Sequence, residues 1–356
     1  MSHLRKGLGT LAAVSSASLL LRPGPRRRGP APVAGAAAGG TGHVRLQGPL
    51  AAEGTATSSH ALALKDAPRN RSAIRRCDCV SRLYELGAPV MPCASRGTQV
   101  LYGERRADGE QVVIKVRRKQ EAHARPEEEQ AWRAGTERLL GLPPHRGVAG
   151  LQEVLEDAEA YYVVMEHVDG RDLFETMCRE GLLPLDEVVA IVRQLLGAIS
   201  HLHSHGLIFR DVKLDNVVLA RRGGSLEVKL VDFDTVSSFD PKLADRPSKD
   251  VLGTDQYIAP EAYDGRYSPS SDVFAVGALA YWLLVGRPPF EPEIFDDVRG
   301  ENRAGSPKMQ AIRGRLLAAS PAWRAGRLAE LPSARRLLQA LLAAEPGRRP
   351  CAEDTK

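Results

Sequence analysis

The stretch "IFRDVKLDNVVL" at residues 208–219 sets five polar side chains between two apolar runs. Asp211 is followed by Lys213 two positions later and by Asn216 five positions later. Charged side chains are rarely buried between strands without a partner or a use. A polar turn would explain some of these residues, but a turn does not require all three. The spacing therefore marks Asp211, Lys213 and Asn216 as candidate functional residues.

The basic charge of the chain is concentrated at its N-terminus. Residues 1–76 hold twelve Lys and Arg against two acids, whereas the other 280 residues hold 37 basic and 42 acidic residues. The net charge of +5 is thus a property of this tail, and we expect no nucleic-acid partner. The tail is rich in Ala, Gly, Pro and Ser and shows no apolar period, so we expect residues 1–76 to be disordered.

Two interpretations of residues 1–50 remain open. Arg5 and Lys6 precede an apolar run from Leu8 to Leu21, which is the order found in targeting segments, and the continuation is Arg-rich and poor in acids. The alternative is a plain extension with no targeting role. The run is too short to span a bilayer, so no transmembrane segment is expected. Five scattered cysteines favour a reducing compartment, which is the cytoplasm, or an organelle if this segment is a presequence.

Strand patterns precede helix patterns along the rest of the chain. Residues 100–116 alternate in polarity around an Asp108-Gly109 hairpin turn, and residues 160–168 form another apolar strand pattern. From residue 184 the apolar period becomes helical, and further helices are expected at 272–286 and 333–343. This order predicts an α+β fold in which a small sheet-rich lobe joins a larger helical lobe.

Further motifs flank the opening stretch in a fixed order. "VVIK" ends at Lys115, "VDFD" covers 231–234, "GTDQYIAPEAY" covers 253–263, and "EPGRRP" covers 345–350. With these motifs the chain resembles the eukaryotic protein kinase family over about residues 84–351. It is closest in style to the calcium/calmodulin-dependent group of serine/threonine kinases.

The resemblance implies a bilobal kinase domain over 84–356. Its N-lobe would cover about 84–166 as an antiparallel sheet with one helix, and its mostly helical C-lobe would cover about 169–356. The family continues for another helix after the "EPGRRP" region, so that helix would be short or absent here. A kinase domain of this kind is expected to act as a monomer on a protein substrate.

The resemblance also implies the chemistry of ATP-dependent phosphate transfer to a protein hydroxyl. Asp211 would be the catalytic base, and Lys213 would neutralise charge on the γ-phosphate. Lys115 would hold the α- and β-phosphates. Asn216 and Asp232 would bind Mg²⁺ through hard oxygen ligands.

The nucleotide base and ribose would lie between the lobes. Met165 would be the gatekeeper, and Asp172 would lie near the ribose, where an acid would favour basic substrates. Val113 stands where the family usually has Ala, which narrows the adenine site. The expected nucleotide-binding residues are Lys115, Val100, Val113, Glu166, Val168, Asp172 and Val218.

Three structural roles follow from the same resemblance. Glu261 would pair with Arg349 inside the helical lobe. Asp272 would brace the backbone of the catalytic loop. Phe209 replaces the family's His before the Arg-Asp pair, and it would pack in the hydrophobic stack between the lobes.

The chain departs from the family pattern at other positions. The Gly-rich loop is reduced to "CASRGTQV" at 93–100, and Asp234 replaces the Gly of the Asp-Phe-Gly motif. The glutamate that should pair with Lys115 falls in register near Gly135 or Thr136, which leaves Glu137 as the nearest candidate and Glu129 as a poorer one. These departures leave a second reading open, in which the domain is a pseudokinase that binds nucleotide or serves as a scaffold.

Arg210 precedes the catalytic Asp and would read a phosphorylated activation-loop residue in the family. Asp250 lies three residues before Gly253, about where that phosphorylated residue would be. We expect Asp250 to pair constitutively with Arg210, which would remove the need for an activating phosphorylation.

Overall fold

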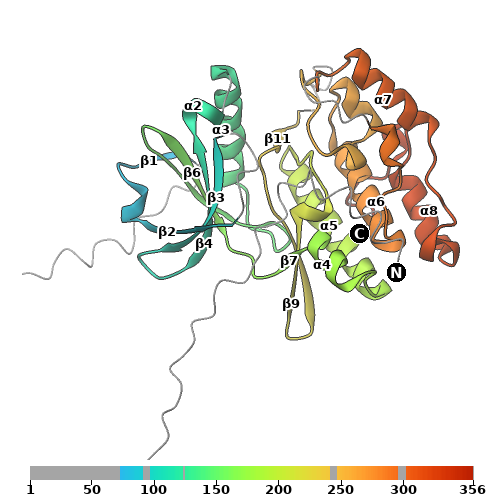
Figure 1. Ribbon diagram of the computed structural model, residues 1–356, viewed down its shortest axis with the longest axis horizontal. Helices are drawn as coiled ribbons and strands as arrows, with labels where there is room; N and C mark the ends of the chain where they lie inside the picture. The colour runs from blue at the N-terminus through green and yellow to red at the C-terminus, as the bar shows by residue number, and fades with distance from the viewer. Residues whose placement is uncertain (1–72, 91–96, 123–124, 241–246, 296–301, 356) are drawn as a thin grey trace, which may run out of the picture. The chain divides into compact units, whose positions relative to one another are not determined.

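A computed structural model of the chain describes residues 73–90, 97–122, 125–240, 247–295 and 302–355 (Figure 1). The predicted tail up to residue 72, including the possible presequence, lies outside the described residues, as does the first half of the degenerate loop at 93–100. No helix in the described ranges is long and apolar enough to cross a membrane.

The N-lobe is built on a six-stranded sheet with the order β1-β5-β6-β4-β3-β2. The Asp108-Gly109 hairpin is confirmed, because Gly109 has φ +75° and joins the antiparallel strands β3 and β4. Every pairing is antiparallel except that of β1 with β5. The strands are β1 (Arg75–Arg76), β2 (Tyr84–Pro89), β3 (Thr98–Arg105), β4 (Gln111–Arg118), β5 (Leu151–Glu156) and β6 (Ala160–Glu166).

The sheet begins earlier in the chain than expected. β1 pairs with β5, and Val80 in the 3-10 helix η1 (Val80–Arg82) is buried against Tyr84 and Ile114. Two-residue strands carry no readable alternation, so the sequence pattern could not show this segment. The folded lobe thus includes residues N-terminal to the predicted boundary at 84.

Strand β4 separates the two faces of this sheet because successive side chains point to opposite sides. Val112 and Ile114 pack in one cluster. Val113 packs in the other cluster with Leu140 of helix α3 (Pro126–Leu140), which lies beside the sheet (Figure 1). Lys115, two residues after Val113, belongs to the face that carries α3. The short helix α2 (Lys119–Ala122) follows β4 directly.

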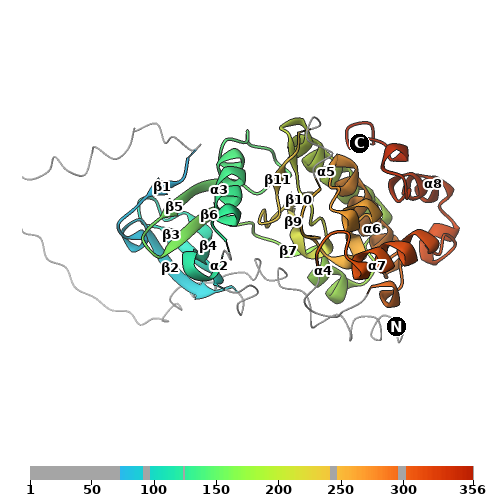
Figure 2. The same ribbon diagram turned by 90° about the horizontal axis from the view of Figure 1, so that it is seen from above.

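The C-lobe is mostly helical, and the expected helices at 272–286 and 333–343 are confirmed within α6 and α8. Figure 2 shows α5 beside α6, with β10 along α5. Almost every residue of α6 is buried, so it forms the centre of this lobe. The helices are α4 (Leu173–Glu180), α5 (Leu185–Ser204), α6 (Pro269–Val285), α7 (Pro307–Ala318) and α8 (Pro332–Leu341).

Short strands and 3-10 helices fill the connections of the C-lobe. β9 pairs with β10 and β7, and β8 pairs with β11. The strands are β7 (Arg171–Asp172), β8 (Leu207–Ile208), β9 (Val217–Arg222), β10 (Ser225–Leu230) and β11 (Ser237–Ser238). The 3-10 helices are η2 (Leu214–Asn216), η4 (Asp255–Tyr257), η5 (Pro260–Asp264), η6 (Pro292–Ile294), η7 (Gly326–Ala329) and η8 (Pro346–Arg348). The α+β fold with a sheet-rich N-lobe and a helical C-lobe is therefore confirmed.

Two buried carboxylates of the C-lobe, Asp272 and Glu261, make the contacts expected of them. The carboxylate of Asp272 accepts hydrogen bonds from the backbone amides of Phe209 at 2.8 Å and Arg210 at 2.7 Å. Glu261 accepts two hydrogen bonds from the Arg349 guanidinium, at 2.6 Å and 2.8 Å, and the Arg349 side chain is fully buried. Both contacts agree with the structural roles expected for these residues.

Candidate active site

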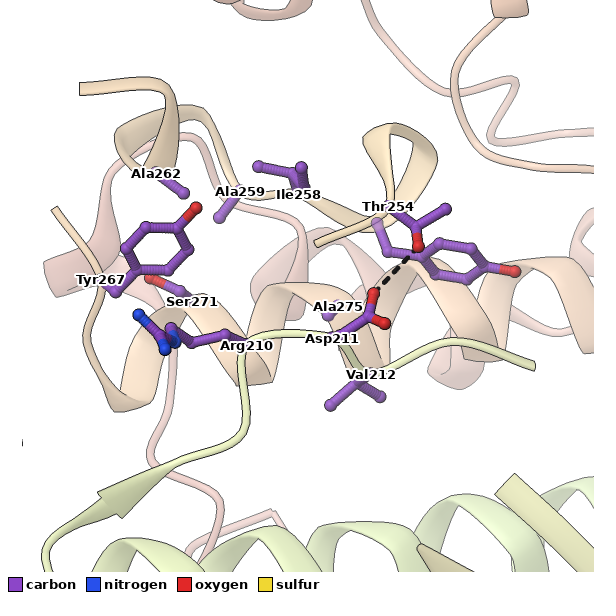
Figure 3. A pocket seen from close by; sticks show the side chains of 11 residues that line it. Arg210, Asp211, Val212, Thr254, Ile258, Ala259, Ala262, Tyr267, Ser271 and Ala275 are labelled. Carbon is purple, nitrogen blue, oxygen red and sulfur yellow. Dashed lines mark hydrogen bonds between the residues drawn. The ribbon is translucent and has the colours of Figure 1, made fainter. Parts of the chain in front are cut away.

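The catalytic loop gathers its polar side chains around the carboxylate of Asp211. Lys213 Nζ lies 3.0 Å from Asp211 Oδ2. Asn216 Nδ2 donates to the same oxygen at 3.0 Å and to the Asp211 backbone carbonyl at 2.8 Å. The hydroxyl of Thr254 donates to Asp211 Oδ1 at 2.9 Å, as Figure 3 shows. Asp211 is thus oriented from both sides, and Thr254 is a site residue that the sequence analysis did not identify.

Asn216 leaves its oxygen free in this arrangement. Its side chain is buried, both hydrogen bonds come from the amide nitrogen, and Oδ1 has no hydrogen-bond partner within the described residues. An unpaired buried amide oxygen is costly unless a cation or water satisfies it. The backbone amide of Val231, next to Asp232, donates to the backbone carbonyl of Asn216 at 2.9 Å. This hydrogen bond joins the segments that carry Asn216 and Asp232. A free amide oxygen and a carboxylate on adjacent segments fit a hard divalent cation such as Mg²⁺.

Lys115 is part of a buried cluster of charges. Its ammonium lies 2.9 Å from Asp232 Oδ1 and 2.5 Å from Asp234 Oδ2. Arg117 Nη1 contacts the same Asp234 oxygen at 3.1 Å. Burial alone would lower the pKa of Lys115, but the two carboxylates outweigh it and raise that pKa above its usual value. The ammonium is therefore charged and held beside Asp232 and Asp234.

The predicted adenine residues partly come together. Val113, Met165, Glu166 and Val168 line one pocket with Asp232. Val218 is fully buried and packs with Val168, whereas Val100 packs in the cluster on the α3 face of the sheet. Neither lines this pocket. The remaining lining residues, which the sequence analysis did not identify, are Ala149, Val231 and Phe233.

Asp172, the residue predicted near the ribose, lies buried at the start of helix α4. Its side chain is 1% exposed and caps helix α4, where Oδ1 accepts the Glu175 amide at 2.7 Å. The second oxygen is buried without a hydrogen-bond partner. Asp is a strong N-cap residue, so the contact with the Glu175 amide holds the side chain at the start of α4. It offers no surface charge for a basic substrate.

Phe209 packs as expected for its position. It is fully buried and meets the ring of Phe233 edge-on at 5.8 Å between centroids. The replacement of His by Phe therefore preserves an aromatic contact between the catalytic loop and the segment that carries Asp232.

Residues 96–356 match the family model described as the protein kinase domain. The chain belongs to the protein kinase family. The match covers the C-lobe and the N-lobe from residue 96 onward, and it includes every residue of the candidate site.

Known kinases resemble part of this kinase domain. A calcium-dependent protein kinase of Oryza sativa subsp. japonica is 35% identical over 161 residues, covering 44% of this chain and 29% of that protein. A death-associated protein kinase of Caenorhabditis elegans is 35% identical over 153 residues, covering 43% of this chain and 10% of that protein. A calcium-dependent protein kinase of Plasmodium falciparum (isolate 3D7) is 29% identical over 227 residues, covering 62% of this chain and 37% of that protein. The matched region thus spans less than two fifths of the length of these relatives.

Helix α3 of the kinase domain brings no glutamate to Lys115. The carboxylate of Glu129 accepts a hydrogen bond from the hydroxyl of Tyr161, and Glu137 has no ion pair among the described residues. Thr136, at the register expected for the glutamate, is buried. Neither candidate, Glu137 nor Glu129, pairs with Lys115 in the described residues.

The expected pair between Asp250 and Arg210 is also absent from the described part of the kinase domain. Arg210 donates from Nε to the Thr235 carbonyl at 2.5 Å, and its guanidinium lies 5.5 Å from the ring centroid of Tyr267. Arg210 and Tyr267 line a pocket beside the catalytic loop and lie at the same end of it (Figure 3). Asp250 instead forms an antiparallel backbone bridge with Arg303, which draws its segment elsewhere.

Proposed function

We propose that this chain transfers the γ-phosphate of ATP to a serine or threonine hydroxyl of a protein. The observation that carries this proposal is the arrangement around Asp211. One carboxylate is held by a threonine hydroxyl, a lysine and an asparagine amide, and the asparagine keeps a free oxygen for a cation. Family membership and the names of the relatives support the same activity.

The residues of the site would divide the work of the transfer. Asp211 would orient the substrate hydroxyl and take its proton as the hydroxyl oxygen attacks the γ-phosphorus. The bond to the β–γ bridging oxygen would break, and ADP would leave with the negative charge. Lys213, 3.0 Å from Asp211, would neutralise charge on the transferred group. Lys115 would hold the α- and β-phosphates.

Asn216 and Asp232 would hold Mg²⁺ in the working site. The free Asn216 oxygen and the Asp232 carboxylate are hard ligands on segments joined by the hydrogen bond from Val231 to Asn216. Bound Mg²⁺ would supply positive charge to the β- and γ-phosphates. The adenine base would enter the pocket lined by Val113, Met165 and Val168.

The test is phosphate transfer by the full chain from radiolabelled ATP and Mg²⁺ to a panel of basic, neutral and acidic peptides that contain Ser, Thr or Tyr. Asp211→Asn is the matched control, because it keeps the size and hydrogen-bonding capacity of the side chain and removes the base. We expect labelled phosphoserine or phosphothreonine, and a loss of roughly 100- to 10,000-fold in kcat for the variant, the range of general base catalysis.

Transfer by the wild type that does not exceed the Asp211→Asn background would contradict the proposal. A thermal unfolding scan with and without ATP and Mg²⁺ then separates the remaining readings. A rise in Tm would indicate a nucleotide-binding pseudokinase, and no change would indicate a scaffold.

A further inference from the structure

Asp234 brings a carboxylate to Lys115 from an unusual place in the chain. It stands where the protein kinase motif has glycine, two residues after Asp232. Its Oδ2 lies 2.5 Å from Lys115 Nζ and 3.1 Å from Arg117 Nη1, so two cations from strand β4 share one oxygen. Asp234 is not among the described non-glycine residues with positive φ, so its backbone does not require glycine.

Helix α3 brings no acid to Lys115, because Glu129, which does face the sheet, binds the hydroxyl of Tyr161 on β6. Trp132 and Leu140 pack with Val113, and the buried Thr136 lies between them at the four-residue spacing of one helix face. A buried ammonium without a fixed anion is strongly disfavoured. In the described chain, the anions that Lys115 contacts both come from the segment 232–234.

We propose that Asp234 is the positioning residue for Lys115. It would pair with Lys115 as a helix glutamate pairs with this lysine elsewhere in the family. The proposal rests on the proposed function in that Lys115 is taken to bind the phosphates of ATP. It goes beyond that function by assigning the anchor of Lys115 to the loop after Asp232.

The division of labour between the two aspartates favours Asp234 for this role. Asp232 contacts Lys115 at 2.9 Å, but its carboxylate is also the one expected to ligate Mg²⁺. Asp234 has both of its cation contacts on a single oxygen and is 33% exposed at its side chain, compared with 10% for Lys115. It can therefore remain the counterion of Lys115 when Asp232 is engaged by the metal.

Arg117 connects this ion pair to helix α3. Its guanidinium lies 5.0 Å from the ring centroid of Trp132, a cation–π contact, while Nη1 binds Asp234. The cluster thus joins β4, the loop after β10 and α3 through Arg117 and Asp234. The position of α3 would be coupled to Lys115 by this route, without a carboxylate on the helix.

The test measures the Kd for ATP with Mg²⁺, together with kcat and KM for ATP, in the full chain and its variants. Asp234→Asn removes the charge at nearly constant volume. Because Lys115 loses its fixed position, we expect kcat/KM to fall about 10- to 100-fold and the Kd for ATP to rise. Asp234→Glu keeps the carboxylate and should retain more of both than Asp234→Asn. Glu227→Gln, an exposed acid on β10, is the control and should match the wild type.

The decisive experiment moves the carboxylate that contacts Lys115 from residue 234 to helix α3. Asp234→Gly restores the glycine of the family motif and should weaken ATP binding as Asp234→Asn does. Adding Thr136→Glu to Asp234→Gly should recover most of the lost affinity, whereas adding Thr136→Gln should not. Recovery that requires a charge at a second site cannot come from a purely structural effect, and thermal unfolding of each variant checks that it is folded.

Unchanged Kd and KM for ATP in Asp234→Asn would overturn the proposal, as would a wild type that does not bind ATP. A wild type that binds ATP but transfers no phosphate would sink the proposed function alone. The binding arm would then still decide the role of Asp234. If Asp234→Asn does not fold, the comparison of Asp234→Glu with the Thr136 pair gives the same decision.

Discussion

The contacts of an aspartate in this domain, more than its residue type, decide the role that it can have. The domain offers four aspartates for comparison, which are Asp211, Asp232, Asp234 and Asp172. Asp211 is held by hydrogen bonds and a lysine, and Asp234 is paired with two cations. Asp172 is buried and caps helix α4, and its second oxygen has no hydrogen-bond partner among the described residues. The same carboxyl group therefore serves as a candidate base, a counterion or a cap.

The pKa of Asp172 makes the stability of the chain depend on pH. Burial, with nearby Asp215 adding to it, raises this pKa from 3.8 to about 7. An acid with a higher pKa in the folded chain binds more protons when folded, so stability falls as pH rises from about 4 to about 7.

Asp172→Asn removes this ionisation and keeps a good N-cap. We expect the variant to be more stable than the wild type at pH 8 by about 2–4 kcal/mol, and the difference to shrink as pH falls toward 4. Chemical denaturation at both pH values measures it. A variant that is less stable than the wild type at pH 8 would show that the ionised carboxylate is favourable in this position.

At the scale of the elements, the N-lobe sheet depends on a segment that carries no readable pattern. β1 contributes only Arg75 and Arg76 to the sheet, and Val80 follows as one buried side chain. The pairing of β1 with β5 is parallel and ends at Glu156, which also binds Lys119 and Arg133. The segment is therefore attached both by its backbone and by Val80.

Val80→Ser tests this attachment. Val80 is 6% exposed and packs with Tyr84 and Ile114, so the polar replacement should lower the free energy of unfolding by about 1.5–3 kcal/mol. Arg76→Ala, at an exposed position on the same segment, should change it by less than about 0.5 kcal/mol. Equal stabilities for Val80→Ser and the wild type in urea unfolding would indicate that residues 73–82 do not belong to the folded lobe.

How much the sequence could predict also differs between elements. Fixed spacings predicted Asp211, Lys213, Asn216 and Lys115 as candidates, because the resemblance to kinases places such residues along one short stretch or at the end of one strand. The partner of Lys115 could not be predicted. It depends on how the loop at 232–234 turns, and Asp232 adopts φ +62°, which residue type alone does not dictate. The sequence showed that Thr136 stands near the register of the missing helix glutamate. A missing glutamate does not show which residue supplies the carboxylate for Lys115 instead.

At the scale of the whole molecule, the fold was predictable because strands precede helices and the motifs occur in the order of the kinase family. The position of Asp250 was not predictable. We expected it beside Arg210, but a backbone bridge to Arg303 decides where it lies. Long-range ionic pairs that were expected from several motifs together, such as Glu261 with Arg349, were found. Single spacings without a supporting motif were poor guides.

The Glu261–Arg349 pair joins η5 to the segment after η8 and should be essential to the C-lobe. Glu261→Gln leaves the Arg349 guanidinium buried without its anion, which should cost about 3–5 kcal/mol of stability. Thermal unfolding measures the loss. Glu345→Gln, which breaks an exposed ion pair with Arg348, is the control and should cost less than about 1 kcal/mol. A similar Tm for both variants would contradict the anchoring role.

The most direct test of the whole account is the ratio of phosphate-transfer rates between the wild type and Asp211→Asn, measured with saturating ATP and Mg²⁺ on one accepted peptide. The account predicts a ratio of at least about 100, because Asp211 is oriented by Thr254, Lys213 and Asn216 to accept the substrate proton. A ratio near 1 would contradict it, since the arrangement around Asp211 would then have no part in catalysis.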